Sequence, residues 1–199
     1  MASKHRPDTV TQLAQQFDPS TADLLGIATA LRRRYEAGTS TDQRKERGQF
    51  FTPTSVAAFM AGLLSTPSKQ LRVLDPGAGT GTLSAAICDR ILHLRSPCSV
   101  EFVLFETDAA VVPTLDENMR HCRRALRKAG HEMGYSIEQA DFILANGPMF
   151  GQQTLFNDGR TVRQFDAAIM NPPYFKLSKN SAHARAFERV IHGQPNIYA

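Results

Sequence analysis

The chain of 199 residues lacks the patterns that mark membrane-spanning, secreted and metal-binding proteins. It contains no run of about 18 apolar residues, the length that a membrane-spanning helix requires. Its charged N-terminus is not followed by the apolar core of a secretory signal. The three cysteines follow no C-x-x-C spacing, which predicts reduced thiols, and the six histidines form no H-E-x-x-H motif. We therefore expect a cytoplasmic protein without a membrane segment or a bound metal.

The apolar periodicity divides the chain into alternating helices and strands. Helices are expected at 9–17, 20–37, 54–65, 81–94, 109–129 and 181–192, and strands at 71–75, 100–106, 135–140 and 165–170. Residues 38–47 form a charged linker and residues 146–164 an irregular excursion. In the helix at 54–65, the side chains expected to face inward are Val56, Phe59, Met60 and Leu63. The alternation predicts an α/β fold with N-terminal helices and a parallel sheet of about four strands, with ligands at the strands' carboxyl ends.

The strand at 165–170 runs into Asn171-Pro172-Pro173-Tyr174. Proline lacks an N–H and has a fixed φ, so the Pro172 carbonyl is held in place as an acceptor. The Asn171 amide oxygen is a second acceptor. Two acceptors beside an aromatic ring suit a planar group that carries an NH₂, such as the exocyclic amine of a base. A strand followed by a tight turn with a surface tyrosine would give the same residues.

The strand at 71–75 runs into a glycine-rich turn, Asp-Pro-Gly-Ala-Gly-Thr-Gly at 75–81. Glycines at 77, 79 and 81 allow the backbone to approach a ligand closely and to adopt positive φ. The spacing differs from the G-x-G-x-x-G of dinucleotide folds. Asp75 would repel a pyrophosphate and tolerate a cation, which favours a ligand with an amino group and a sulfonium. A plain strand–helix turn is the alternative.

Glu106 ends the second apolar strand. In a βαβ unit, an acid at this point lies beside the first loop and can accept both hydroxyls of a ribose. A nicotinamide cofactor would use the same acid, so Glu106 indicates a nucleoside without naming the cofactor. A solvated glutamate at the end of a strand is the alternative.

Together these motifs resemble the S-adenosylmethionine-dependent adenine-N6 methyltransferases of DNA. The segment 47–54 (Arg-Gly-Gln-Phe-Phe-Thr-Pro-Thr) is similar to the one that, in these enzymes, closes over the methionine end of the cofactor. This segment comes first, followed by the glycine loop and then by the Asn-Pro-Pro-Tyr tetrapeptide. That order is the gamma arrangement and resembles the methylases of restriction–modification systems. The resemblance implies a Rossmann-like methyltransferase fold with S-adenosyl-L-methionine as cofactor, over roughly residues 44–198.

The resemblance also implies roles for particular residues. Catalysis is assigned to Asn171, Pro172, Pro173 and Tyr174. Cofactor binding is assigned to Thr52, Asp75, Gly77, Gly79, Gly81, Glu106, Asp141, Phe142 and Asn171. Glu106 would bind the ribose, Asp141 the adenine amine of the cofactor, and Phe142 the face of its ring. The expected partner is double-stranded DNA with the target adenine flipped out of the helix, because the N6 amine is inaccessible within a duplex.

The resemblance covers only part of a complete enzyme of this family, which has seven strands in its sheet. We expect residues 1–47 to form an N-terminal helical segment and basic linker. Residues 48–199 would form the methyltransferase domain without its C-terminal strands and target-recognition domain. The chain would then be the N-terminal part of a longer or split enzyme, completed by a downstream region or a second chain. Alone, it is expected to be inactive.

Other functions remain open. Release-factor glutamine methyltransferases and some ribosomal RNA guanine-N2 enzymes carry a similar Asn-Pro-Pro-Tyr motif. The segment Gln-Phe-Phe-Thr-Pro at 49–53 favours the DNA enzymes, because the others do not typically carry it. A non-catalytic fragment that binds cofactor or a partner subunit is a third possibility, supported by the missing strands.

The net charge of +4 permits a nucleic-acid partner without requiring one. The cluster at 44–47 is the better candidate for contact with the DNA backbone. A second basic stripe on the helix at 109–129 comprises Arg120, Arg123, Arg124, Arg127 and Lys128. The family sheet order places that helix away from the catalytic tetrapeptide, so we interpret this stripe as a solvated face.

Overall fold

Four parallel strands form one sheet in the computed structural model, which describes residues 23–39, 51–64, 69–146, 163–172 and 181–187. The strand order is β3-β2-β1-β4. The strands are β1 (Gln70–Asp75), β2 (Ser99–Phe105), β3 (Glu132–Glu138) and β4 (Ala167–Ala168). The parallel α/β sheet predicted from the sequence is confirmed. Because all strands run in the same direction, their carboxyl ends meet at one edge.

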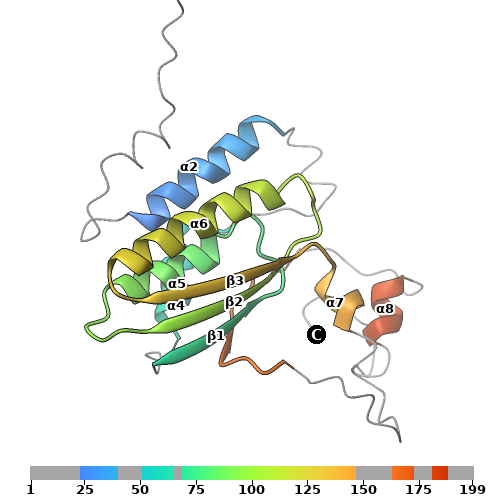
Figure 1. The fold of residues 1–199 in the computed structure, drawn as a ribbon. Coiled ribbons are helices and arrows are strands. Elements are labelled where there is room, and N and C mark those ends of the chain that lie inside the picture. The colour runs from blue at the N-terminus through green and yellow to red at the C-terminus, as the bar shows by residue number, and fades with distance from the viewer. Residues whose placement is uncertain (1–22, 40–50, 65–68, 147–162, 173–180, 188–199) are drawn as a thin grey trace, which may run out of the picture.

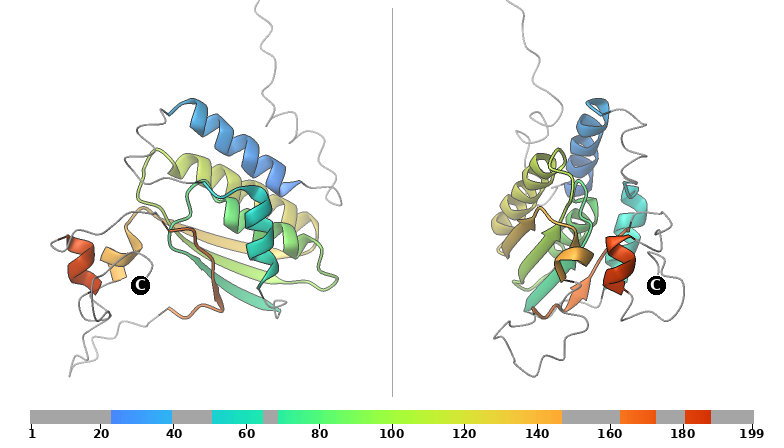
Figure 2. Two further views of the ribbon diagram at one scale, coloured as in Figure 1. Left: turned by 180° about the vertical axis from the view of Figure 1, so that it is seen from behind. Right: turned by 90° about the vertical axis from the view of Figure 1, so that its right-hand side faces the viewer.

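The longer helices lie on one side of this sheet, and two short ones lie beyond its carboxyl edge (Figure 1). They are α2 (Leu24–Ala37), α4 (Thr54–Gly62), α5 (Thr82–Leu92), α6 (Val112–Lys128), α7 (Phe142–Asn146) and α8 (Ala182–Phe187). Helices α5 and α6 lie against the sheet and α2 lies across both, while α4 packs beside α5 (Figures 1 and 2). The short helices α7 and α8 lie beyond the carboxyl ends of the strands (Figure 1). Within the described ranges, no helix combines the length and apolar character needed to cross a membrane.

Helix α2 begins at Leu24 because Asp23 caps it, accepting a hydrogen bond from the Gly26 N–H at 2.6 Å. Its apolar residues recur at helical spacing and are buried against α5 and α6. The buried set is Leu24, Ile27, Ala28, Leu31 and Tyr35. Helix α2 therefore shares a core with the sheet domain.

The basic stripe of α6 is exposed, as expected of a solvated face. Arg120 pairs with Asp116 one turn earlier at 2.8 Å, and the Arg123 guanidinium lies 5.1 Å from the centroid of the Tyr135 ring. The apolar residues of the same helix, Leu115 and Met119 among them, are fully buried. The cluster at 44–47 lies outside the described residues.

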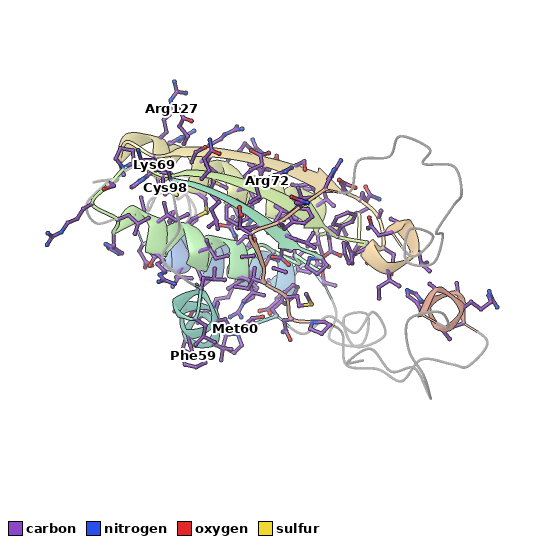
Figure 3. All side chains as sticks on the ribbon, turned by 90° about the horizontal axis from the view of Figure 1, so that it is seen from below. Phe59, Met60, Lys69, Arg72, Cys98 and Arg127 are labelled. Carbon is purple, nitrogen blue, oxygen red and sulfur yellow. The ribbon has the colours of Figure 1, made fainter. Side chains whose placement is uncertain are left out.

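The inward face predicted for α4 is wrong for Val56, Phe59 and Leu63, whereas Met60 packs against the core. Val56, Phe59 and Leu63 are 44%, 67% and 70% exposed, and Met60 is half-buried. Figure 3 shows Phe59 on the side of α4 that faces away from α5. Instead, Ala57 and Ala61 are buried. Small side chains at this spacing allow close approach to α5. Arg90 of α5 then donates to carbonyls at the end of α4, including that of Ala61 at 2.6 Å.

Two strands differ by more than one residue from their predicted ranges. β3 starts at Glu132 rather than at residue 135, because it pairs in register with the whole of β2 from Ser99 onward. β4 comprises only Ala167–Ala168 rather than 165–170, and within the described part of the chain it pairs only with β1. Helix α7 was not predicted. The helix expected at 9–17 lies outside the described residues, as do 147–162 of the predicted excursion and the end of the predicted helix 181–192.

Candidate functional site

The glycine-rich turn joins β1 to α5 at the carboxyl edge of the sheet. Gly79 (φ 53°) and Gly81 (φ 80°) adopt the positive φ angles that favour glycine. Gly77 does not, which corrects the expectation for that position. A Cβ at Gly77 would meet no atom within 4 Å, so this glycine leaves open space beside the turn. The Ala78 N–H donates to the Phe105 carbonyl at 2.9 Å and thereby ties the turn to the end of β2.

Glu106 follows β2 and is bound to the glycine-rich turn. Its Oε2 accepts the Gly79 N–H at 2.8 Å, and its Oε1 accepts the Asp108 N–H at 2.8 Å. The residue is only 9% exposed, and burial raises the pKa of its carboxyl although these N–H groups lower it. The alternative of a solvated strand-end glutamate is therefore wrong. Glu106 is an ordered acceptor beside Gly79.

Asp75 ends β1 and is fully buried. Its Oδ2 accepts the Ser84 hydroxyl at 3.0 Å, while among the described residues its Oδ1 has no hydrogen-bond partner. Burial raises the pKa of Asp75 to about 7, and the nearby Glu106 carboxylate adds to this, although the Ser84 hydroxyl and the Gly77 N–H act in the opposite direction. Nothing in the sequence indicated Ser84 as a partner. A buried carboxylate with an unused acceptor atom suits a ligand that donates from a cationic group.

The free energy of unfolding is expected to fall as the pH rises from about 4 to 7 on account of Asp75. Its pKa is about 7 in the folded chain against an ordinary value of 3.8, so in this window the folded state keeps a proton that the unfolded chain releases. The stabilising contribution is complete below pH 3.8 and is lost as the pH rises through 7. Its size is about 4 kcal/mol.

Denaturant unfolding of the wild type and Asp75→Asn from pH 4 to 8 tests this expectation. The amide cannot ionise, so the difference between the two proteins isolates Asp75 and its interaction with Glu106 from the histidines. The variant should gain stability relative to the wild type as the pH rises. Parallel curves would show that Asp75 titrates near its ordinary value.

Asp141 and Phe142 lie where β3 gives way to α7. Asp141 Oδ1 accepts the Leu144 N–H at 2.9 Å, which caps this short helix. Phe142 meets Phe105 at the end of β2, with ring centroids 5.1 Å apart and an interplanar angle of 79°. The sequence did not indicate Phe105, because its role depends on this contact between strand ends.

Thr52 and Asn171 are 119 positions apart in the sequence and are joined by a hydrogen bond. The Asn171 Nδ2 donates to Thr52 Oγ1 at 3.0 Å, and Thr52 is 7% exposed. Phe51, the residue before Thr52, lies over the glycine-rich turn, where its ring atoms would be 3.5 Å from a Cβ placed on Gly79. Its ring also packs edge-on against Tyr35 of α2.

The predicted site residues that the structure describes therefore gather at one edge of the sheet, and contacts run from Thr52 and Asn171 through Phe51 to Gly79 and Glu106. Pro172 is half-buried next to Asn171. Pro173 and Tyr174 lie outside the described residues. In the part of the chain that is described, no group of three His, Cys, Asp or Glu side chains could hold a metal ion.

A family model for N-6 DNA methylases matches residues 35–196. The chain belongs to the N-6 DNA methylase family. The match begins within α2 and extends beyond α8, so it includes every predicted site residue. This confirms the family that the sequence resembles.

Curated relatives of this chain are Type II methyltransferases. M.BsuBI of Bacillus subtilis is 31% identical over 175 residues, which are 87% of this chain and 33% of the relative. M.PstI of Providencia stuartii is 26% identical over 170 residues, which are 83% of this chain and 32% of the relative. The chain thus spans about a third of the length of these two relatives.

A solved structure shares the fold of this chain. It is a protein of Listeria monocytogenes assigned as a class I S-adenosylmethionine-dependent methyltransferase. The TM-score is 0.54 at 17% identity, and the match covers 92% of this chain and 50% of the other. The Rossmann-like methyltransferase fold predicted from the sequence is confirmed.

Proposed function

We propose that this chain forms the cofactor-binding and catalytic-motif part of an enzyme that transfers a methyl group from S-adenosylmethionine to the N6 amine of adenine in DNA. The enzyme would be the methylase of a restriction–modification system. Membership of the N-6 DNA methylase family and the names of the Type II relatives support this assignment. Because those relatives are about three times as long, a further region or a second chain would supply the rest of the enzyme.

The hydrogen bond between Asn171 and Thr52 is the observation that carries the proposal. Methyl transfer requires the target amine and the cofactor to share one site in a fixed orientation. Asn171 begins the motif expected to hold the target base. Thr52 follows Phe51, which lies against the glycine-rich turn expected to hold the cofactor. The two halves of the site are therefore joined by a direct contact.

The described residues fit S-adenosylmethionine by their donor–acceptor chemistry. The cofactor presents an ammonium group, two ribose hydroxyls and an exocyclic amine, all of which donate hydrogen bonds. The site presents the carboxylates of Asp75, Glu106 and Asp141, and the first has a buried oxygen without a partner in the described chain. Burial raises the pKa of both Asp75 and Glu106, and a cation or hydroxyl donors bound beside these acids would lower it again. A phosphate-rich ligand would be repelled.

When bound, the cofactor supplies an electrophilic methyl group on its sulfonium. The role of the chain is to orient the nucleophile, because the lone pair of the adenine N6 amine is delocalised into the ring. The Asn171 Nδ2 donates to Thr52, so Oδ1 is the atom of this amide that would accept an N–H of the base. The Pro172 carbonyl would accept the other. Two acceptors favour a pyramidal nitrogen whose lone pair points at the methyl group, and the effect amounts to several kcal/mol.

The target adenine would have to leave the DNA duplex to reach Asn171, at an unstacking cost of a few kcal/mol. Tyr174 would offset part of this cost by stacking on the flipped base, with Pro173 holding the turn. These two roles rest on the resemblance alone. The partner is therefore double-stranded DNA.

The cofactor part of the proposal predicts that the 199-residue chain binds S-adenosylhomocysteine in calorimetry and does not bind NAD. Glu106→Ala should weaken binding by about 1–3 kcal/mol, because it removes the acceptor expected for the ribose hydroxyls. The same substitution leaves the N–H groups of Gly79 and Asp108 without this acceptor, so the melting temperature must be measured in parallel.

Glu132→Ala is the matched control, because Glu132 is an exposed glutamate at the opposite end of the sheet. Its affinity should equal that of the wild type. Competition by NAD as strong as that of S-adenosylhomocysteine would contradict the assignment of the cofactor.

A further inference from the structure

His183 of α8 contacts an acid of the proposed cofactor site. Its Nε2 lies 2.8 Å from Asp141 Oδ2, and the two side chains are 26% and 29% exposed. They come from α8 and from the residue that precedes α7, and these short helices pack together. Partial burial of both groups strengthens the contact relative to a surface pair. The sequence motifs did not include His183.

Both carboxylate oxygens of Asp141 make contacts, and these contacts fix the orientation of the carboxylate. Oδ1 accepts the Leu144 N–H at 2.9 Å, and Oδ2 pairs with His183. The first contact is local to α7 and would hold the carboxylate at one point only. The second comes from another helix and prevents rotation about that point. A carboxylate offers about four acceptor positions, so these two contacts leave capacity for a further donor.

The neighbouring ring fixes where that donor would lie. Phe142 follows Asp141 directly and is held by its edge-to-face contact with Phe105 at the end of β2. An adenine that packs on Phe142 would present its exocyclic amine to the carboxylate of the preceding residue. The angle of the carboxylate then decides whether that amine is bound well.

We propose that His183 is a positioning residue, which holds Asp141 in the orientation in which its carboxylate accepts the exocyclic amine of the cofactor's adenine. This inference rests on the proposed function, because it assumes that Asp141 meets that amine. It also links the segment that follows the target-base motif to the cofactor site. His183 follows the Asn-Pro-Pro-Tyr motif in sequence, so the polypeptide that carries the target-base motif also contributes to recognition of the cofactor.

The test compares two ligands and four proteins by calorimetry. The ligands are S-adenosylhomocysteine and its analogue with hydrogen in place of the 6-amino group. His183→Ala should weaken binding of S-adenosylhomocysteine roughly fivefold to tenfold, the value of a well-oriented hydrogen bond. It should change binding of the analogue by less than about twofold, because the analogue has no amine for Asp141 to accept. His183→Gln should restore most of the affinity, because its amide N–H can replace the donor.

His93→Ala serves as the control, since His93 is an exposed histidine at the end of α5 away from the site. An equal loss for both ligands in His183→Ala would show a merely structural role and overturn the inference. Tighter binding of S-adenosylhomocysteine would overturn it as well, because His183 would then compete with the adenine for Asp141. If the wild type binds neither ligand, the proposed function itself fails. An unchanged affinity in His183→Ala would reject only the role of His183.

Discussion

Replacing Asn171 by alanine is expected to lower the rate of methyl transfer by about 10²- to 10³-fold, in an enzyme that contains this chain together with the remaining polypeptide. The substitution removes Oδ1 as an acceptor for the adenine amine. It also removes the bond to Thr52, through which the target motif contacts the segment over the glycine-rich turn. Affinity for S-adenosylhomocysteine should be largely retained, because Asp75, Glu106 and Asp141 are unchanged. Transfer of a radiolabelled methyl group to mixed-sequence duplex DNA measures the rate, and calorimetry measures the affinity.

Met170→Ala is the appropriate control for this variant, because Met170 directly precedes Asn171 and is 43% exposed. It should transfer methyl groups at nearly the wild-type rate. The modified base in hydrolysed DNA should be N6-methyladenine. Methylcytosine, or methylglutamine in a protein, would contradict the proposed substrate, and an Asn171→Ala variant with wild-type activity would contradict the proposed catalytic role.

Replacing Gly81 by alanine is expected to lower the free energy of unfolding by about 2–5 kcal/mol. Two penalties add at this position. The backbone φ of 80° is unfavourable for a residue with a Cβ, at a cost of about 1–2 kcal/mol. The new Cβ would also lie 2.8 Å from Leu115 Cδ1 and 3.0 Å from Met119 Cε. Both of these side chains are fully buried, so neither can move away without disturbing the core.

Two other glycines separate these penalties. Gly130 has a φ of 84°, and a Cβ added there would meet no atom within 4 Å, so Gly130→Ala should show the backbone cost alone. Gly77 has neither a positive φ nor a neighbour within that distance, so Gly77→Ala should fold as stably as the wild type. Urea unfolding of the three variants should give the order Gly81, Gly130, Gly77 in decreasing loss of stability. Equal losses for Gly81→Ala and Gly130→Ala would show that crowding by Leu115 and Met119 contributes nothing.

The sequence was most informative where a signal is local. The apolar runs of β1 and β2, and the glycines between β1 and α5, are short-range patterns that few other structures satisfy. The positions of Asp75 and Glu106 followed from them, because the ends of neighbouring parallel strands share one edge of the sheet. The face of α2 was also predictable, because its large apolar residues form one helical stripe, whereas Asp23 was not predicted as its cap.

The sequence was least informative where two sets of residues in one element both fit the spacing of a buried face. In α4, Ala57 and Ala61 recur at helical spacing, and so do Val56, Phe59 and Leu63. Either set could have faced the core. The close approach of α5, held by Arg90 at the end of α4, decided in favour of the small residues. The extent of β4 likewise depended on its neighbour, because pairing with β1 involves only Ala167 and Ala168.

By itself, then, the sequence determined the class of fold and the family and predicted the principal site residues, because strand runs, glycine turns and short motifs are encoded by residues close together in the chain. Tertiary structure alone decided which of these residues touch. Thr52 and Asn171 are 119 positions apart, and Asp141 and His183 are 42 apart. No local pattern specifies such pairs, because each contact depends on the relative positions of several packed elements.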